Sequence, residues 1–109
     1  MFAAMGEHSQ KKQRRRQPRR IRTLIAEDSA VVRDMIATYL EKQGRFEIVG
    51  LAADGREAVE LAAKLEPDLV LTDMNMPRMN GLDATRRIKK APRPPRVIVV
   101  TFADASAMR

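Results

Sequence analysis

Acidic and hydroxyl side chains interrupt this 109-residue sequence at the points where three short apolar segments end. Glu27 and Asp28 end the first of these segments, Asp73 ends the second and Thr101 ends the third. Carboxylates brought together repel one another unless a cation neutralises them, and Mg²⁺ is the natural partner because it prefers oxygen ligands and retains waters. A carboxylate held beside such a cation can attack a phosphoryl group, while the metal offsets the developing charge. The pattern therefore indicates Mg²⁺-assisted phosphoryl chemistry on a carboxylate.

Each of these residues also has a simpler interpretation. A single aspartate after a strand more often caps a helix or forms a turn, and Asp28-Ser29 has the form of a helix cap. Threonine is common in strands, so Thr101 alone indicates nothing. The joint placement at three strand ends is much harder to obtain by chance, and it favours the chemical interpretation.

The segments around these residues alternate between strand and helix patterns. Strands are predicted at 23–26, 46–52, 68–73 and 97–100. Helices are predicted from Val31 to Leu40, behind the capping box Asp54-Gly55-Arg56-Glu57, and over 81–90. The alternation predicts a parallel sheet with helices on both faces, and the apolar segments 69–71 and 97–100 are typical of strands buried on both sides.

The predicted sheet explains how distant carboxylates can meet. In open doubly wound sheets, sites form beyond the carboxyl ends of the strands. If the first and third strands are neighbours, Glu27, Asp28 and Asp73 converge at one edge of the sheet. Thr101 then lies one strand further along.

Length and composition limit the alternatives. A chain of 109 residues holds one small domain, and 44% hydrophobic with 32% charged residues is typical of a soluble globular protein. The absence of cysteine excludes disulfides and thiolate metal sites. No apolar run approaches the roughly 18 residues of a membrane span, and the N-terminus lacks the apolar core of a secretory signal. We therefore expect a cytoplasmic protein with no membrane association.

The net charge of +7 is concentrated in one segment. Eight basic residues and one acid precede Thr23, whereas the remainder has 13 basic and 13 acidic residues. Residues 1–20 are polar and lack apolar periodicity, so we expect a disordered basic arm before a domain at 21–109. Its arginines suit a solvated tail, an artefactual upstream start, or nucleic-acid binding through counterion release. Its single aromatic, Phe2, lies far from the arginines, so base stacking is not indicated.

Three segments together resemble the receiver domain of bacterial two-component response regulators. Leu24 to Ser29 (LIAEDS) resembles the acidic-pair opening of that family, and Val97 to Thr101 (VIVVT) resembles its fourth strand. Asp73 to Gly81 (DMNMPRMNG) matches the phospho-acceptor loop almost position for position. The resemblance implies a flavodoxin-like doubly wound parallel sheet and a role in phosphorelay signal transduction.

The resemblance also implies roles for individual residues. Asp73 would accept a phosphoryl group from a histidine kinase or a histidine phosphotransfer protein. The carboxylates of Glu27, Asp28 and Asp73 would hold Mg²⁺ together with the backbone carbonyl of Asn75. Thr101 would supply the switch hydroxyl that hydrogen-bonds the phosphoryl group. Such a protein is not an enzyme but assists its own Mg²⁺-dependent phosphorylation and dephosphorylation.

The sequence departs from the family pattern in three ways. It ends at Arg109, before the family's fifth strand with its lysine and the helix that follows, so we expect about four strands and three helices. The bulky Phe102 stands where the family usually has a small residue, and the basic arm is not a family feature. The alternative is therefore a truncated or degenerate receiver that acts as a non-switching interaction module. In that curtailed sheet, 97–100 becomes an exposed apolar edge.

Overall fold

The computed structural model describes residues 19–101, which contain four strands and three helices. The strands are β1 (Ile21–Ala26), β2 (Phe46–Ala52), β3 (Leu69–Asp73) and β4 (Arg96–Val100), and the helices are α2 (Ala30–Lys42), α3 (Gly55–Leu65) and α4 (Gly81–Ile88). They form one parallel sheet of order β2-β1-β3-β4. This confirms the flavodoxin-like doubly wound fold. The predicted disorder of the arm, through residue 18, and the effect of Phe102 concern residues outside those described.

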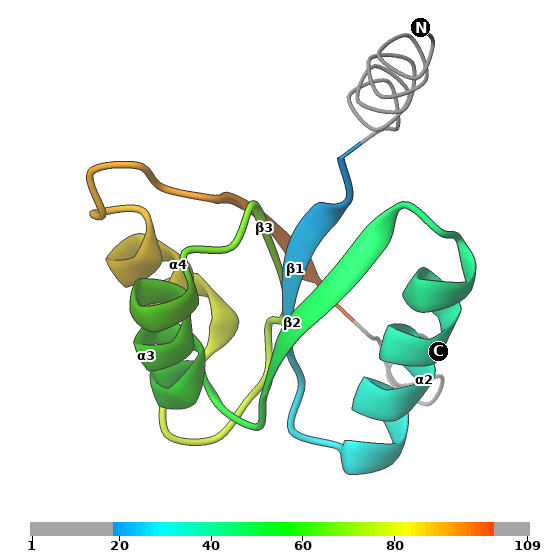
Figure 1. Ribbon diagram of the computed structural model, residues 1–109. Helices are drawn as coiled ribbons and strands as arrows, with labels where there is room; N and C mark the ends of the chain where they lie inside the picture. The colour runs from blue at the N-terminus through cyan, green and yellow to red at the C-terminus, as the bar shows by residue number, and fades with distance from the viewer. Residues whose placement is uncertain (1–18, 102–109) are drawn as a thin grey trace, which may run out of the picture.

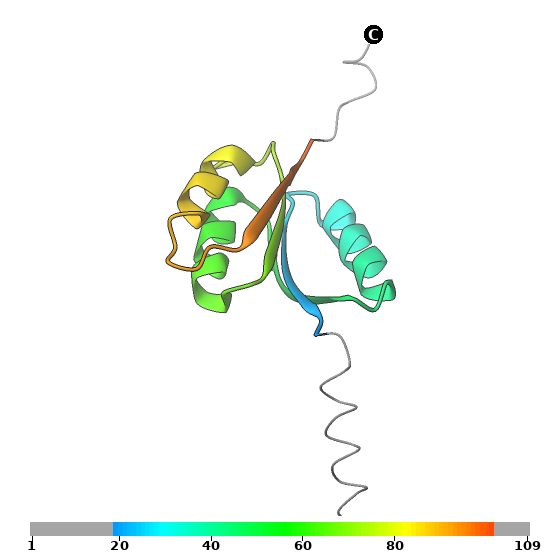
Figure 2. The ribbon, with the colours of Figure 1, turned by 90° about the horizontal axis from the view of Figure 1, so that it is seen from above.

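Helices cover both faces of the sheet, but unequally (Figures 1 and 2). Helices α3 and α4 pack side by side on one face, and α2 lies alone on the other (Figure 1). The core lies on the α3–α4 side and contains Leu24, Ala26, Ala52, Ala58, Ala62, Val70, Met76, Ala84 and Ile88. Within residues 19–101, no helix has both the length and the apolar character needed to cross a membrane.

Local sequence signals set most of the element boundaries. Asp54 caps α3 by accepting the backbone N–H of Glu57, as predicted. The Glu57 side chain accepts the N–H of Ala53, so the reciprocal bond of the capping box goes to the residue before the cap. Helix α4 ends at Ile88, two residues earlier than predicted. The following Pro92 disfavours helical backbone just before it, and the chain turns instead.

The face under α2 is more open than the sequence indicates. None of the residues of α2 is buried, and Val31, Met35 and Tyr39 are each about two-thirds exposed. On this side of the sheet, Ile25 of β1 is fully buried. Ile98 of β4, which lies in the same row across the sheet with Leu71 of β3 between them, is 51% exposed. Helix α2 thus covers β1 and β2 but not β4. The apolar pattern of 97–100 indicated burial on both sides, which is wrong at Ile98. The expectation of an exposed apolar edge is confirmed, because within residues 19–101 β4 is an edge strand.

Candidate functional site

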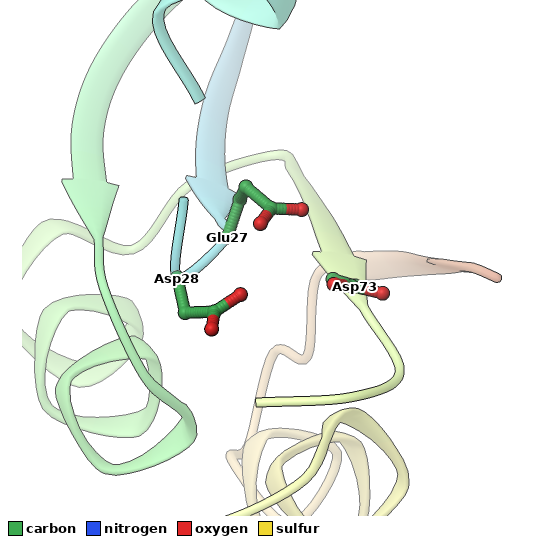
Figure 3. A group of neighbouring side chains, drawn as sticks. All are labelled: Glu27, Asp28 and Asp73. Carbon is green, nitrogen blue, oxygen red and sulfur yellow. The ribbon is translucent and has the colours of Figure 1, made fainter. Parts of the chain in front are cut away.

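Three carboxylates meet at the carboxyl ends of β1 and β3 (Figure 3). These strands are direct neighbours, with Ala26 paired to Thr72, so the residues that follow them emerge side by side. Glu27, Asp28 and Asp73 each offer a carboxylate oxygen, and these oxygens all lie within 4.8 Å of one another. The convergence predicted from the strand ends is therefore observed.

Within the described residues, none of the three carboxylates of the cluster forms an ion pair with a protein cation. Glu27 is 4% exposed, and burial raises the pKa of its carboxyl group. The backbone N–H of Ser29, at 2.8 Å, opposes this rise in pKa, while the neighbouring carboxylates of Asp28 and Asp73 add to it. Among residues 19–101, the two ion pairs are Arg78–Asp54 and Arg86–Asp83, and neither includes a member of the cluster. Such an oxygen-rich, negatively charged group fits a hard divalent cation.

Asn75 and Thr101 were the other two predicted site residues. Asn75 is two residues after Asp73, and Thr101 follows the neighbouring strand β4. The backbone N–H of Asn75 donates to Oδ1 of Asp73 at 3.3 Å, so the backbone at Asn75 folds back toward the Asp73 carboxylate. Asp73 pairs with Val100 of β4, and the N–H of Met74 donates to the Val100 carbonyl at 3.0 Å. Thr101 therefore lies one strand away from Asp73, as predicted, with its Oγ1 4.0 Å from the sulfur of Met74.

Two glycines let the loop after Asp73 lie close to its neighbours. A Cβ on Gly81 would lie 2.3 Å from the carbonyl oxygen of Asp73, and one on Gly55 would lie 2.0 Å from that of Met79. Both distances are far shorter than a carbon–oxygen contact permits, so any side chain would push the loop away. The N–H of Gly81 also donates to the carbonyl of Met74 at 2.8 Å, which closes the loop.

An ion pair ties the same loop to the start of α3. Nε of Arg78 donates to Oδ2 of Asp54 at 2.8 Å, and Arg78 has a left-handed backbone with φ of 67°. The N–H of Glu57 and then the Arg78 guanidinium lower the pKa of Asp54. Sequence reasoning identified Asp54 as a helix cap but missed its second partner, because the two residues are 24 positions apart. Left-handed backbone at an arginine has no sequence signal of its own.

Comparisons with known proteins agree with this geometry. The family model of the response regulator receiver domain matches residues 23–109. The transcriptional regulatory protein PdtaR of Mycobacterium tuberculosis (strain H37Rv) is 48% identical over 87 residues, which cover 80% of this chain and 41% of PdtaR. A protein-glutamate methylesterase/protein-glutamine glutaminase of Geobacter metallireducens is 48% identical over 85 residues, covering 78% of this chain and 24% of that protein.

Solved structures show the same fold. The signal receiver domain of the putative response regulator NarL from M. tuberculosis superposes with a TM-score of 0.75 at 30% identity, covering 84% of this chain and 73% of that one. The response regulator domain of CheB from Thermotoga maritima gives a TM-score of 0.73 at 38% identity, covering 83% and 69%. The chain spans about a quarter to two fifths of the length of the curated relatives it matches. It belongs to the response regulator receiver domain family, the receiving modules of two-component phosphorelay signalling.

Proposed function

We propose that Asp73 is the phospho-acceptor of this receiver and takes its phosphoryl group from a histidine kinase or a histidine phosphotransfer protein. Receivers are generally phosphorylated by donors of these two kinds, and the proposal names no particular kinase or phosphotransfer protein. The observation that carries the proposal is the cluster of carboxylate oxygens within 4.8 Å at the carboxyl ends of β1 and β3. Asp73 is the member at the end of β3, where its loop is tightly held.

The transfer is a displacement at phosphorus. A carboxylate oxygen of Asp73 forms the new O–P bond while the P–N bond of the donor phosphohistidine breaks, and the electron pair of that bond stays on the donor imidazole. The contact from the Asn75 N–H to Oδ1 of Asp73 holds the carboxylate in one orientation for attack. Thr101, which follows Val100 at the end of the neighbouring strand, would donate its hydroxyl to a phosphoryl oxygen.

Receivers generally bind Mg²⁺ at an acidic pocket, and the residues present here fit that ion. We assign its ligands to the carboxylates of Glu27, Asp28 and Asp73 and to the backbone carbonyl of Asn75. When bound, Mg²⁺ offsets the negative charge on the phosphoryl oxygens. The raised pKa of Glu27 supports this assignment, because it reflects a buried carboxylate beside two others. The receiver would extend over 21–109, preceded by the basic arm.

Intact mass measurement tests the acceptor directly. The full chain is incubated with Mg²⁺ and a small-molecule phosphodonor such as phosphoramidate. The expected result is a mass increase of one phosphoryl group that requires Mg²⁺ and disappears in Asp73→Asn. The same samples give a second readout, because an ion that binds only the folded state raises its stability by about 2.7 kcal/mol at 100 times its dissociation constant. Asp28→Asn should remove most of that Mg²⁺-dependent stabilisation.

Asp34→Asn is the matched control, since Asp34 is an exposed carboxylate on α2 outside the cluster. It should accept the phosphoryl group and respond to Mg²⁺ as the parent chain does. No mass increase in a folded parent chain would refute the acceptor proposal. That result would favour the alternative, a receiver that acts only as a non-switching interaction module.

A further inference from the structure

Charge is distributed very unevenly within the folded domain. Residues 85–96 contain six cations and no acid, whereas 23–84 contain six cations and twelve acids. The six cations, which together we name the basic connector, are Arg86, Arg87, Lys89, Lys90, Arg93 and Arg96. All six are exposed. A positive surface of this density attracts a polyanion.

The basic connector lies at the end of the sheet opposite the carboxylate cluster. It runs from the C-terminal end of α4 to the start of β4, and in Figure 1 it lies at the same end of the sheet as the start of β1. Asp68 links the two places, because its carboxylate accepts the N–H of Arg22 at 2.9 Å and its carbonyl accepts the N–H of Arg96 at 3.0 Å. The exposed Arg19 and Arg20, which precede β1, therefore extend the positive surface of the connector.

Helix capping explains only part of this charge. A cation in the last turn of a helix interacts favourably with the helix dipole, and α2 and α3 each have one, Lys42 and Lys64. Helix α4 has two, Arg86 and Arg87, and four more cations follow within nine residues. Among the described residues, Arg86 is the connector's one member of an ion pair, with Asp83 at 2.9 Å. Lys89 also makes a structural contact, because its Nζ donates to the Pro95 carbonyl at 2.8 Å, whereas the other four connector cations have no ion-pair partner among the described residues.

We propose that the basic connector, together with Arg19 and Arg20, binds the phosphate backbone of nucleic acid. Four of its six cations are arginines, whose planar guanidinium matches phosphate oxygens. Residues 85–96 contain no aromatic side chain for base stacking, so the contacts are to the backbone and are independent of sequence. The site is distinct from the carboxylate cluster and does not depend on the phospho-acceptor role.

An anionic membrane is a poorer match than nucleic acid. Basic surfaces that lie on membranes usually add large apolar side chains that enter the lipid. None of the exposed large apolar residues of the described chain falls within 85–96. Three of them are on α2, and single ones lie beside the connector at Ile21, Leu82 and Ile98. Helix α2 lies on the other face of the sheet from α4 (Figure 1). Residues 85–96 thus offer lipid no exposed large apolar side chain of their own.

Fluorescence anisotropy with a labelled DNA duplex tests this proposal in the full chain between 50 and 200 mM salt. The parent chain should bind with micromolar affinity that weakens steeply as salt rises. Each cation that contacts a phosphate contributes about 0.9 to the slope of log affinity against log salt. The double variant Arg87→Gln/Lys90→Gln should lower that slope by about 1.8. Because the affinities converge at about 1 M salt, this corresponds to roughly 60-fold weaker binding at 100 mM salt.

Arg56→Gln/Arg78→Gln is the matched control. It removes the same charge from exposed positions at the start of α3 and in the loop after β3, both at the carboxyl ends of the strands and so at the opposite end of the sheet from the connector. The control should bind as the parent does, and far-UV circular dichroism verifies that both double variants are folded. Equal weakening in the two variants would overturn the proposal, because binding would then follow net charge alone. Failure of the parent to bind duplex at 50 mM salt, or connector-dependent binding to phosphatidylserine vesicles but not to duplex, would overturn it as well.

Discussion

The two faces of the sheet differ in how completely they are covered. Between the sheet and helices α3 and α4 lies a closed core that includes Leu24 and Val70, both with no exposed surface. On the other face α2 has no buried residue, and Ile98 is half exposed. The same sheet therefore has one face with a packed interior and one that remains open beside β4.

The acceptor loop is attached to the closed face. Met76 belongs to the core, Gly55 of α3 lies against the backbone of Met79, and Asp54 pairs with Arg78. The open face contributes to the site mainly through the start of α2, where Arg33 donates to the carbonyl of Glu27 at 2.7 Å. The rigidity of the acceptor loop thus depends on the α3–α4 face, and substitutions there should disturb it most.

The largest contrast is expected between Leu24→Ala and Met35→Ala. Leu24 is fully buried in the closed core, so its truncation leaves a cavity and should lower the free energy of unfolding by about 2–5 kcal/mol. Met35 is 65% exposed on α2, and its truncation should cost less than about 0.5 kcal/mol. Urea denaturation of the two variants measures the difference. Equal losses would show that the α2 face is as tightly packed as the other.

An intermediate effect is expected from Gly55→Ala, which tests how the loop is held. The new methyl group would collide with the backbone carbonyl of Met79, so we expect a loss of about 1–3 kcal/mol and slower phosphorylation of Asp73. Gly50→Ala is the control, because its methyl group would meet only side-chain ends, that of Leu65 at 2.8 Å and that of Leu24 at 3.1 Å. It should leave the phosphorylation rate unchanged. A normal rate in a folded Gly55→Ala variant would contradict the anchoring role of this contact.

The smallest effect is expected from Asp54→Asn, whose cost should depend on pH. The pKa of Asp54 is lowered in the folded state, so its charge stabilises the fold above about pH 4, the unfolded pKa, and the contribution is lost as pH falls further. Asparagine still caps the helix, and Arg78 is largely exposed to screening, so the cost at pH 7 should stay below about 1 kcal/mol. Urea denaturation between pH 3 and 7 measures it. Salt should reduce the difference, and a cost that stays constant down to pH 3 would contradict the ion-pair explanation.

Much of this protein follows from local sequence signals. The capping box at Asp54 and Glu57 sets the start of α3, the helical spacing from Val31 to Leu40 predicts α2, and the apolar segments predict four strands. Such signals act over a few residues, so they do not require knowledge of which distant segments become neighbours. The position of the acids at strand ends could also be predicted from the sequence, and the carboxyl ends of parallel strands lie at the same edge of a sheet. The particular acids in the site were therefore predictable.

Tertiary structure decided which distant segments became neighbours. The sequence did not determine whether β1 and β3 are neighbours. Their pairing in the sheet is what brings Glu27 and Asp28 close to Asp73. The Arg78–Asp54 ion pair joins residues 24 positions apart, and no local pattern specifies it. The exposure of Met35 likewise depends on what packs over α2 and not on its helical spacing. Periodicity determines which residues share a helix face, but the path of the whole chain determines whether that face is covered.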